Sequence, residues 1–298
     1  MCILLGTTAH PRYSLILISN RDEFYERETH PTCVHSDDFI VSPFDMSITT
    51  KGRNFGTWCG VNKDGKVAVL LNLRIASSVN LKNVECPQSR GIVPMKFLAE
   101  KDVDFNNWDS YEKFSHHYPG IEKTGNFNLF YGDCSKGEYK LISSLSETTD
   151  GFQNDDGYMV VSNDLISSKK KWGKISLAKN LLQNLVESSV DDTKDSILDK
   201  CFELASHSTC SEKIVVKHES VTNETIYVPP LLVENGQDLD VSMPCGKYYG
   251  TRSQIVILVS KDQKKMTFVE RVLYTCDEDV LKYGPKNPKE QIEFEFDI

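Results

Sequence analysis

The chain lacks several features that would assign it to a class at once. It has no run of about 18 apolar residues, and its start has neither the basic region nor the apolar stretch of a secretory signal. Its nine cysteines form no CxxC pair, zinc-ligand spacing or haem-attachment motif. Acidic side chains outnumber basic ones by 43 to 34, which gives a net charge of −9. We therefore expect a reduced, cytoplasmic protein with no transmembrane segment, metal site or nucleic-acid partner.

The pattern along the chain favours an α+β fold. No repeat or linker interrupts it, so one domain spanning residues 1–298 is expected. Strands and helices come in blocks rather than as repeating βαβ units, which favours helices layered on packed antiparallel sheets. Strand patterns cover residues 2–8, 13–20, 55–61, 66–73, 127–132, 139–145, 158–162, 248–252, 255–260, 266–274 and 292–296. Helical patterns cover 89–117, 165–186 and 193–206, and the polar stretch 208–237 is expected to be a loop.

Cys2 is the first candidate for chemistry. Removal of Met1 would leave a cysteine that carries both a thiol and a free α-amine. An α-amine has a pKa of about 8 and a free thiol one of about 8.5, so the amine can take the thiol proton without a histidine. This device is typical of N-terminal-nucleophile amide hydrolases. The alternative is a small apolar residue that simply packs at the start of a buried strand.

A second candidate is the run Asn20-Arg21-Asp22-Glu23, which ends an apolar strand. If the first two strands pair as a hairpin, the end of the second lies beside Cys2. An arginine and a carboxylate at that place would hold the α-amine and lower the pKa of the thiol. Taken alone, the run is more typical of a solvated turn.

Three further motifs follow along the chain: Gly56-Thr57-Trp58-Cys59-Gly60, Ser162-Asn163 and Tyr249-Gly250-Thr251-Arg252. Together with the two candidates above, they resemble the NRDE family, also called the transport and Golgi organisation protein 2 family. The resemblance covers residues 1 to about 275. It implies an αββα sandwich of two antiparallel sheets flanked by helices, distantly similar to the N-terminal-nucleophile hydrolases that cleave choloylglycine and penicillin V.

The same resemblance implies roles for six residues. In the acylases two residues separate the arginine from the aspartate, whereas here Arg21 and Asp22 are adjacent. Whether Asp22 or Glu23 faces the amine therefore stays open. The implied catalytic set is Cys2 as nucleophile, Arg21 and Asp22 as the charged group that orients it, Asn163 as an oxyanion donor, Arg252 as a late arginine near the nucleophile, and Asn72 as a further polar contributor.

No established reaction comes with this family, which is linked to secretory-pathway organisation, mitochondrial and lipid metabolism, and handling of haem or acyl-coenzyme A. Our preferred interpretation is a binding protein whose cleft at Cys2 holds a small hydrophobic anionic ligand, haem or acyl-coenzyme A, with no required cofactor. The side chains expected to hold the ligand are those of Asn20, Arg21, Asp22, Glu23 and Arg252.

Two alternatives stay open: a cysteine N-terminal-nucleophile hydrolase of an amide or thioester, and a trafficking scaffold. Lys169-Lys170-Lys171 indicates at most a weak contact with an anionic membrane surface, because three charges are too few for stable anchoring. A cytoplasmic location is expected, with association to mitochondria or the Golgi left open.

Overall fold

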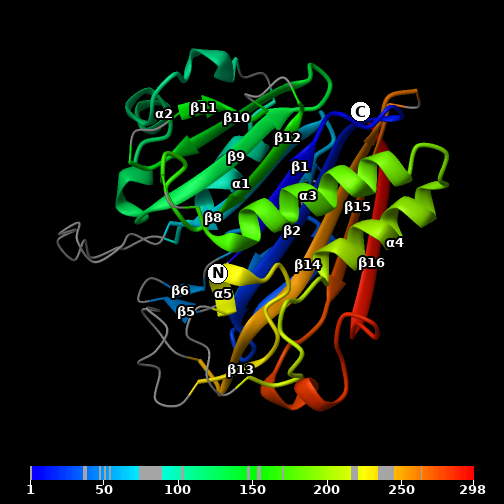
Figure 1. The fold of residues 1–298 in the computed structure, drawn as a ribbon. Coiled ribbons are helices and arrows are strands. Elements are labelled where there is room, and N and C mark those ends of the chain that lie inside the picture. Colours follow the sequence, from blue (N-terminus) through cyan, green and yellow to red (C-terminus); the bar gives the residue numbers. More distant parts are fainter. Residues whose placement is uncertain are drawn as a thin grey trace.

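Two large antiparallel sheets, stacked face to face, make up most of the protein (Figure 1). The computed structural model describes residues 2–298 except 36–38, 47, 50–51, 54, 74–88, 102–103, 146–147, 153–155, 170, 216–220, 234–244 and 263. Met1 and Lys170 therefore lie outside the described residues. No helix within the described ranges is long and apolar enough to cross a membrane.

The first sheet is buried on both faces. Along its second strand, Leu15 and Leu17 face the other sheet, while Ile16 and Ile18 face a layer of helices. This alternation follows from the two-residue period of a strand. The order of the strands is β12 (Tyr158–Ser162), β1 (Ile3–Thr7), β2 (Tyr13–Phe24), β14 (Tyr248–Ser260), β15 (Lys265–Val272) and β16 (Glu290–Asp297), with β13 (Leu231–Leu232) also paired to β14.

Asp64-Gly65, between the strand patterns over 55–61 and 66–73, is a strong turn signal that predicts a hairpin, and the second sheet contains this hairpin. Gly65 adopts a φ of +86°, a left-handed conformation that suits glycine. The order of the strands is β11 (Thr148–Asp150), β10 (Glu138–Ser143), β9 (Phe127–Asp133), β8 (Lys66–Asn72), β7 (Cys59–Asn62), β4 (Ile40–Asp45) and β3 (Thr29–Val34). A separate short hairpin joins β5 (Ile48–Thr49) and β6 (Gly52–Arg53).

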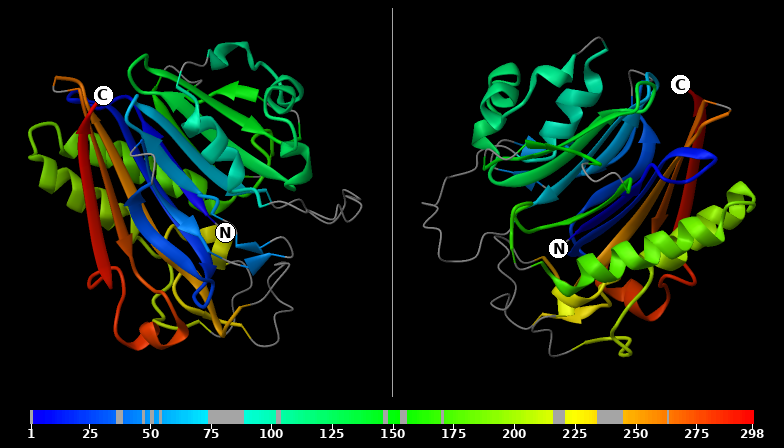
Figure 2. Two further views of the ribbon diagram at one scale, coloured as in Figure 1. Left: turned by 180° about the vertical axis from the view of Figure 1, so that it is seen from behind. Right: turned by 45° about the horizontal axis from the view of Figure 1, so that its top comes forward.

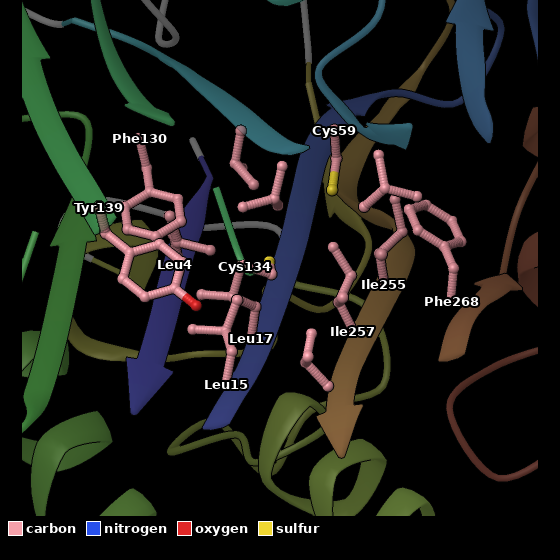
Figure 3. Close-up of a cluster of buried hydrophobic side chains, with 14 of the residues drawn as sticks. Leu4, Leu15, Leu17, Cys59, Phe130, Cys134, Tyr139, Ile255, Ile257 and Phe268 are labelled. Atoms are coloured by element: carbon pink, nitrogen blue, oxygen red, sulfur yellow. The ribbon is translucent and has the colours of Figure 1, made fainter. Parts of the chain in front are cut away.

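The main hydrophobic core lies between the two sheets. Leu4, Leu17 and Ile257 from the first sheet meet Cys59 and Phe130 from the second, and all are almost fully buried (Figure 3). Burial of this apolar surface is the main force that holds the sheets together. The ends of the strands, where the core stops, are the places left for polar side chains.

Helices cover the two outer faces, so the predicted αββα sandwich is confirmed (Figures 1 and 2). The first sheet is covered by α3 (Gly173–Ser188) and α4 (Lys194–Ala205), and the second by α1 (Ile92–Ala99) and α2 (Tyr111–His117). The remaining helical segments are α5 (Val221–Glu224) and three short 3₁₀ helices, η1 (Phe105–Asn107), η2 (Ile121–Lys123) and η3 (Asp277–Leu281).

Several boundaries differ from the sequence-based expectation. The helix expected over 165–186 begins only at Gly173, and the helical pattern over 89–117 is two helices separated by η1. The strands expected at 248–252 and 255–260 are one strand, β14, with a register shift at Arg252. The expected loop over 208–237 contains α5 and β13 in its described part. The strands β3 and β4 were not predicted.

Candidate functional site

The strand pairing places Cys2 between two strand ends. Ile3 pairs with Asn20 of β2 on one side and with Ser162 of β12 on the other. The Ser162 hydroxyl donates a hydrogen bond of 2.6 Å to the carbonyl of Cys2. The hairpin expected from the sequence therefore exists, and it brings the end of β2 beside Cys2.

A cavity of about 120 Å³ opens beside the half-buried Cys2. Both sheets contribute to its walls, and Trp58 and Leu70 are the largest apolar side chains there. Ligand pockets are commonly about 300–1,000 Å³, so the described lining fits the polar end of a metabolite rather than a whole large molecule. The formal charges of the lining side chains sum to zero. The positive ones are on Arg21, Arg27 and Arg90, and the negative ones are on Asp22, Glu23 and Asp45.

The run 20–23 divides between the two faces of the first sheet. Asn20 points toward the helices, where its side-chain amide donates to the carbonyls of Ala205 and Ile226 at 2.8 and 3.0 Å. Asp22, two residues on, accepts a 2.6 Å bond from the hydroxyl of Thr251. Because alternate residues of a strand share a face, Arg21 and Glu23 point instead toward the second sheet. The predicted ligand group is therefore split, and Asn20 does not line the cavity.

The side chain of Arg21 makes several contacts at the cavity wall. It is 7% exposed, and its guanidinium lies 4.3 Å from the centroid of the Trp58 ring. Its Nη2 is 3.4 Å from Glu23 and 3.5 Å from Asp45. Arg27 shares both carboxylates, at 3.5 and 2.7 Å. The two arginines and two carboxylates thus form one ion-pair network on the cavity wall.

Cys2 and Asp22 influence each other's ionisation. Burial raises the pKa of the Cys2 thiol, and the Asp22 carboxylate raises it further, while the Asp22 backbone N–H and Arg21 act in the opposite direction. In the chain that begins at Met1 the pKa of the thiol is thus raised, and the lowered pKa expected for a chain that begins at Cys2 stays a prediction. Burial also raises the pKa of Asp22, against the effect of the Lys174 ammonium and the Thr251 hydroxyl. Asp22 thus acts on the Cys2 thiol, and whether Asp22 or Glu23 faces the α-amine stays a prediction.

Asn72 and Asn163 come from different sheets and contact each other, and of the two Asn72 lines the cavity. Asn72 ends β8 and lines the cavity, and Asn163 directly follows β12. The side-chain amide of Asn163 donates a 2.5 Å hydrogen bond to the carbonyl of Asn72. Asn163 thus joins the two sheets, and one of its two amide hydrogens is already used for that purpose.

Arg252 lies apart from this cavity. It sits at the register shift in β14, is 3% exposed and borders a separate cavity of about 20 Å³ that also touches Arg21. Its guanidinium donates to the backbone carbonyls of Tyr274 at 3.0 Å and Thr275 and Phe24 at 3.5 Å, and also to that of Arg27. The structure therefore gives Arg252 a role in holding loops and strand ends together.

Two side chains of this region were not predicted as functional. In the sequence Trp58 is only a member of the motif Gly56-Thr57-Trp58-Cys59-Gly60, yet its side chain forms part of the cavity wall. Lys174 was part of a predicted helix, and its side chain is fully buried. No signal in a single sequence marks a helical lysine as buried. Over the described ranges, no group of three or more His, Cys, Asp or Glu side chains is placed to hold a metal ion.

Two glycine backbones meet at the cavity wall, which gives a first test of its packing. A Cβ at Gly91 would lie 2.8 Å from the backbone of Gly56, and the Thr57 N–H donates to the Gly91 carbonyl at 3.0 Å. Overpacking of this kind costs about 1–3 kcal/mol, so Gly91→Ala should lower the free energy of unfolding by that amount in urea denaturation. Gly284→Ala is the control, because its Cβ would meet nothing closer than 3.5 Å. Equal stability of the two variants would contradict close packing at this wall.

Comparisons with known proteins agree with the sequence motifs. The family model described as "Transport and Golgi organisation 2" matches residues 1–275. The chain is 47% identical to an uncharacterized protein of Saccharomyces cerevisiae, over 100% of both chains. It is 28% identical to the Transport and Golgi organization protein 2 homolog of Homo sapiens, over 89% of this chain and 88% of that protein.

Solved structures with some likeness to this chain are hydrolases. The penicillin V acylase from Agrobacterium tumefaciens is 12% identical, with a TM-score of 0.46 over 90% of this chain and 82% of its own. A variant of the conjugated bile acid hydrolase from Clostridium perfringens is 10% identical, with a TM-score of 0.45 over 100% of this chain and 97% of its own.

Proposed function

The chain belongs to the Transport and Golgi organisation 2 family, and from this membership and the cavity beside Cys2 we propose that it binds the anionic end of a hydrophobic metabolite, haem or an acyl-coenzyme A. Relatives in Bos taurus and Homo sapiens are named for transport and Golgi organization. A role in haem or lipid handling, and a cytoplasmic location with association to mitochondria or the Golgi, are parts of the same proposal for this chain.

Two buried donors on the cavity wall carry the proposal. Arg21 Nη1 and Trp58 Nε1 have no hydrogen-bond acceptor within the described residues. Both side chains line the cavity with Cys2. Buried donors without an acceptor are rare, because each loses its bonds to water without replacement. A carboxylate, phosphate or thioester carbonyl entering the cavity would supply the missing acceptor.

The apolar side of the cavity suits the next atoms of such a ligand. The Trp58 ring and Leu70 lie on the wall, so a carbon chain or ring edge that follows the anionic group would meet apolar surface. The haem propionates and the thioester end of an acyl-coenzyme A both combine an oxygen acceptor with an apolar neighbour. Only the end of either ligand fits the described volume.

The test is a titration with haem, palmitoyl-coenzyme A and free coenzyme A, followed by absorbance for haem and by calorimetry for the others. A hydrogen bond to a charged group contributes about 1.5–3 kcal/mol, so Arg21→Met should weaken the bound ligand about 10- to 150-fold. Trp58→Phe, which removes the indole N–H and leaves a smaller aromatic ring, should weaken it by a smaller factor. Arg27 still neutralises Glu23 and Asp45 in the Arg21 variant, which limits the loss of stability.

Trp108→Phe is the matched control, because Trp108 is similarly buried but lies in the core beneath α1 and α2. It should leave affinity unchanged. The proposal is wrong if neither haem nor palmitoyl-coenzyme A binds to the wild type, or if Arg21→Met binds the ligand as tightly as the wild type does.

A second candidate is hydrolysis of an amide or thioester by Cys2. The observation that favours it is the position of Cys2 on the cavity wall with Asp22 acting on its thiol. Two observations weigh against it: burial raises the pKa of the thiol, and the Asn163 amide already donates to Asn72. Binding therefore stays the preferred function.

A further inference from the structure

One edge of the first sheet is long and regular. β16 spans eight residues without proline and pairs with β15 in one unbroken register. It forms the outer edge of the sheet (Figures 1 and 2), and no other strand within the described ranges pairs with it. The other edge strands are less regular or shorter: β3 contains Pro31 and a register shift, and β11 and β12 span three and five residues. A long, regular edge is a ready template for one more strand.

The pairing with β15 determines which backbone groups of β16 face the free edge. Asp297 pairs with Lys265, and the N–H of the next residue, Ile298, donates to the carbonyl of Lys264 at 2.9 Å. In an antiparallel ladder such a bond flanks a pair that is not itself hydrogen-bonded, so the N–H and C=O of Asp297 point away from β15. The two kinds of pair alternate along the ladder. The residues whose backbone groups face the free edge are therefore Gln291, Glu293, Glu295 and Asp297.

The side chains of β16 form two rows of different character, because alternate residues of a strand share a face. On the face toward the second sheet, Phe294 and Phe296 are half-buried and pack against the core between the sheets. The other face carries an acidic row of three exposed side chains, those of Glu293, Glu295 and Asp297. A strand added at this edge would place its own side chains beside both rows.

The edge keeps a negative charge. All four charged residues of β16 are acidic. Lys194 pairs with Glu293 and Glu295 at 3.0 and 2.8 Å, and Lys265 reaches Glu295 at 3.5 Å. These two ammonium groups offset only part of the acidic charge. The acids without an ion-pair partner within the described residues are Glu290 and Asp297.

A second copy of this chain is a poor occupant of the edge. If the two sheets met with matching faces, the acidic row of one β16 would lie opposite the acidic row of the other, and like charges directly opposite destabilise a strand pair. If one copy were turned over, carboxylates would lie opposite Phe294 and Phe296. Both arrangements are unfavourable, so the acidic row protects the chain against pairing with itself.

We propose that the free edge of β16 binds an extended segment of another protein in which lysine or arginine alternates with apolar residues. The basic side chains lie beside the acidic row, and the apolar ones continue the row of Phe294 and Phe296. The backbone groups of the segment bond to those of β16 that face the free edge, which is recognition by strand addition. The edge does not include the Cys2 cavity, so the inference is independent of the proposed function.

The probe is the fluorescently labelled peptide Lys-Val-Lys-Val-Lys-Val-Lys, which matches Gln291–Asp297 residue for residue. Its binding is followed by fluorescence anisotropy. The control peptide, Val-Val-Val-Lys-Lys-Lys-Lys, has the same composition and charge but no alternation. The wild type should bind the alternating peptide at least about tenfold more tightly, because only that peptide places several cross-strand pairs in register at once.

Charge reversal tests the acidic row. The double variant Glu293→Lys, Asp297→Lys should bind the alternating peptide at least about tenfold more weakly, since attraction becomes repulsion at two positions. Lys194 keeps its pair with Glu295 in this variant. The matched control is Asp109→Lys, Glu112→Lys at α2 on the far side of the second sheet, where one acid also pairs with a lysine and both acids are exposed. This control should keep the wild-type affinity.

A second pair of variants tests the backbone contact. Glu295→Gln and Glu295→Pro both remove the charge, but only the proline removes an N–H that faces the free edge, and neither removes a bond to β15. The proline variant should bind at least about fivefold more weakly than the glutamine variant. Thermal melting verifies that each variant is folded. If Glu295→Pro does not fold, the charge-reversal variants decide the question.

Three results would overturn the proposal. The first is equal affinity of the wild type for the alternating and the control peptide. The second is unchanged affinity in the folded Glu293→Lys, Asp297→Lys variant. The third is a dimer of the wild type in sedimentation that is lost in the same variant, because the edge would then belong to a second copy. None of these measurements uses haem or an acyl-coenzyme A, so they stand whether or not the proposed function holds.

Discussion

Arg252→Met should lower the free energy of unfolding by about 3 kcal/mol. A buried acceptor left without a donor costs about 1–3 kcal/mol, and this change removes the donor from several buried backbone carbonyls. The guanidinium bonds to carbonyls at the end of β2 and just after β15. It therefore joins two segments that are distant in sequence. Urea denaturation followed by tryptophan fluorescence measures the change.

Arg271→Met is the matched control. Arg271 lies on β15, where it donates to Gln291 at 2.7 Å and pairs with the exposed Asp199. The ion pair with the exposed Asp199 contributes about 0–1 kcal/mol and the contact of the Arg271 guanidinium with the Phe202 ring, at 3.9 Å, about 0.5–1 kcal/mol, so this variant should lose clearly less stability than Arg252→Met. A folded, stable Arg252→Met protein that has lost affinity for haem or palmitoyl-coenzyme A would contradict the structural role and support the ligand contact implied by the family resemblance.

The fold was largely predictable because the strands show clear patterns. The apolar run ending at Asn20 identified β2, and Asp64-Gly65 identified the turn between β7 and β8. Strands β3 and β4 gave no such signal, since each contains a proline, Pro31 or Pro43, that weakens the pattern of a strand. Their pairing is decided by contacts with the rest of the second sheet.

The site was predicted in position but not in orientation. The hairpin that places Arg21 and Asp22 beside Cys2 follows from the sequence. That Arg21 faces the second sheet and Asp22 the helices depends on the exact register, which a sequence does not give. Lys174 was missed for a similar reason, because its burial results from how α3 docks on β1.

Cys2→Ala should leave binding of haem and palmitoyl-coenzyme A within about threefold of the wild type, or about 0.7 kcal/mol, if the site is a binding cleft. The thiol is one small group on a wall where, among the residues that the structure describes, the donors without an acceptor belong to Arg21 and Trp58. The wild type should then show no hydrolysis of palmitoyl-coenzyme A. Cys33→Ala is the control, since Cys33 is also half-buried but lies on β3, away from the cavity lining.

The hydrolase alternative makes the opposite prediction and depends on the chain terminus. A cysteine nucleophile of this class needs its own α-amine, so turnover should appear only in protein that begins at Cys2 and should vanish in Cys2→Ala. Both forms can be prepared and checked by intact mass. With Met1 retained, burial holds the thiol protonated near neutral pH, and the Asn163 amide is engaged by Asn72. Hydrolysis by the Cys2-terminal protein, lost in Cys2→Ala while binding persists, would therefore replace the binding function with a catalytic one.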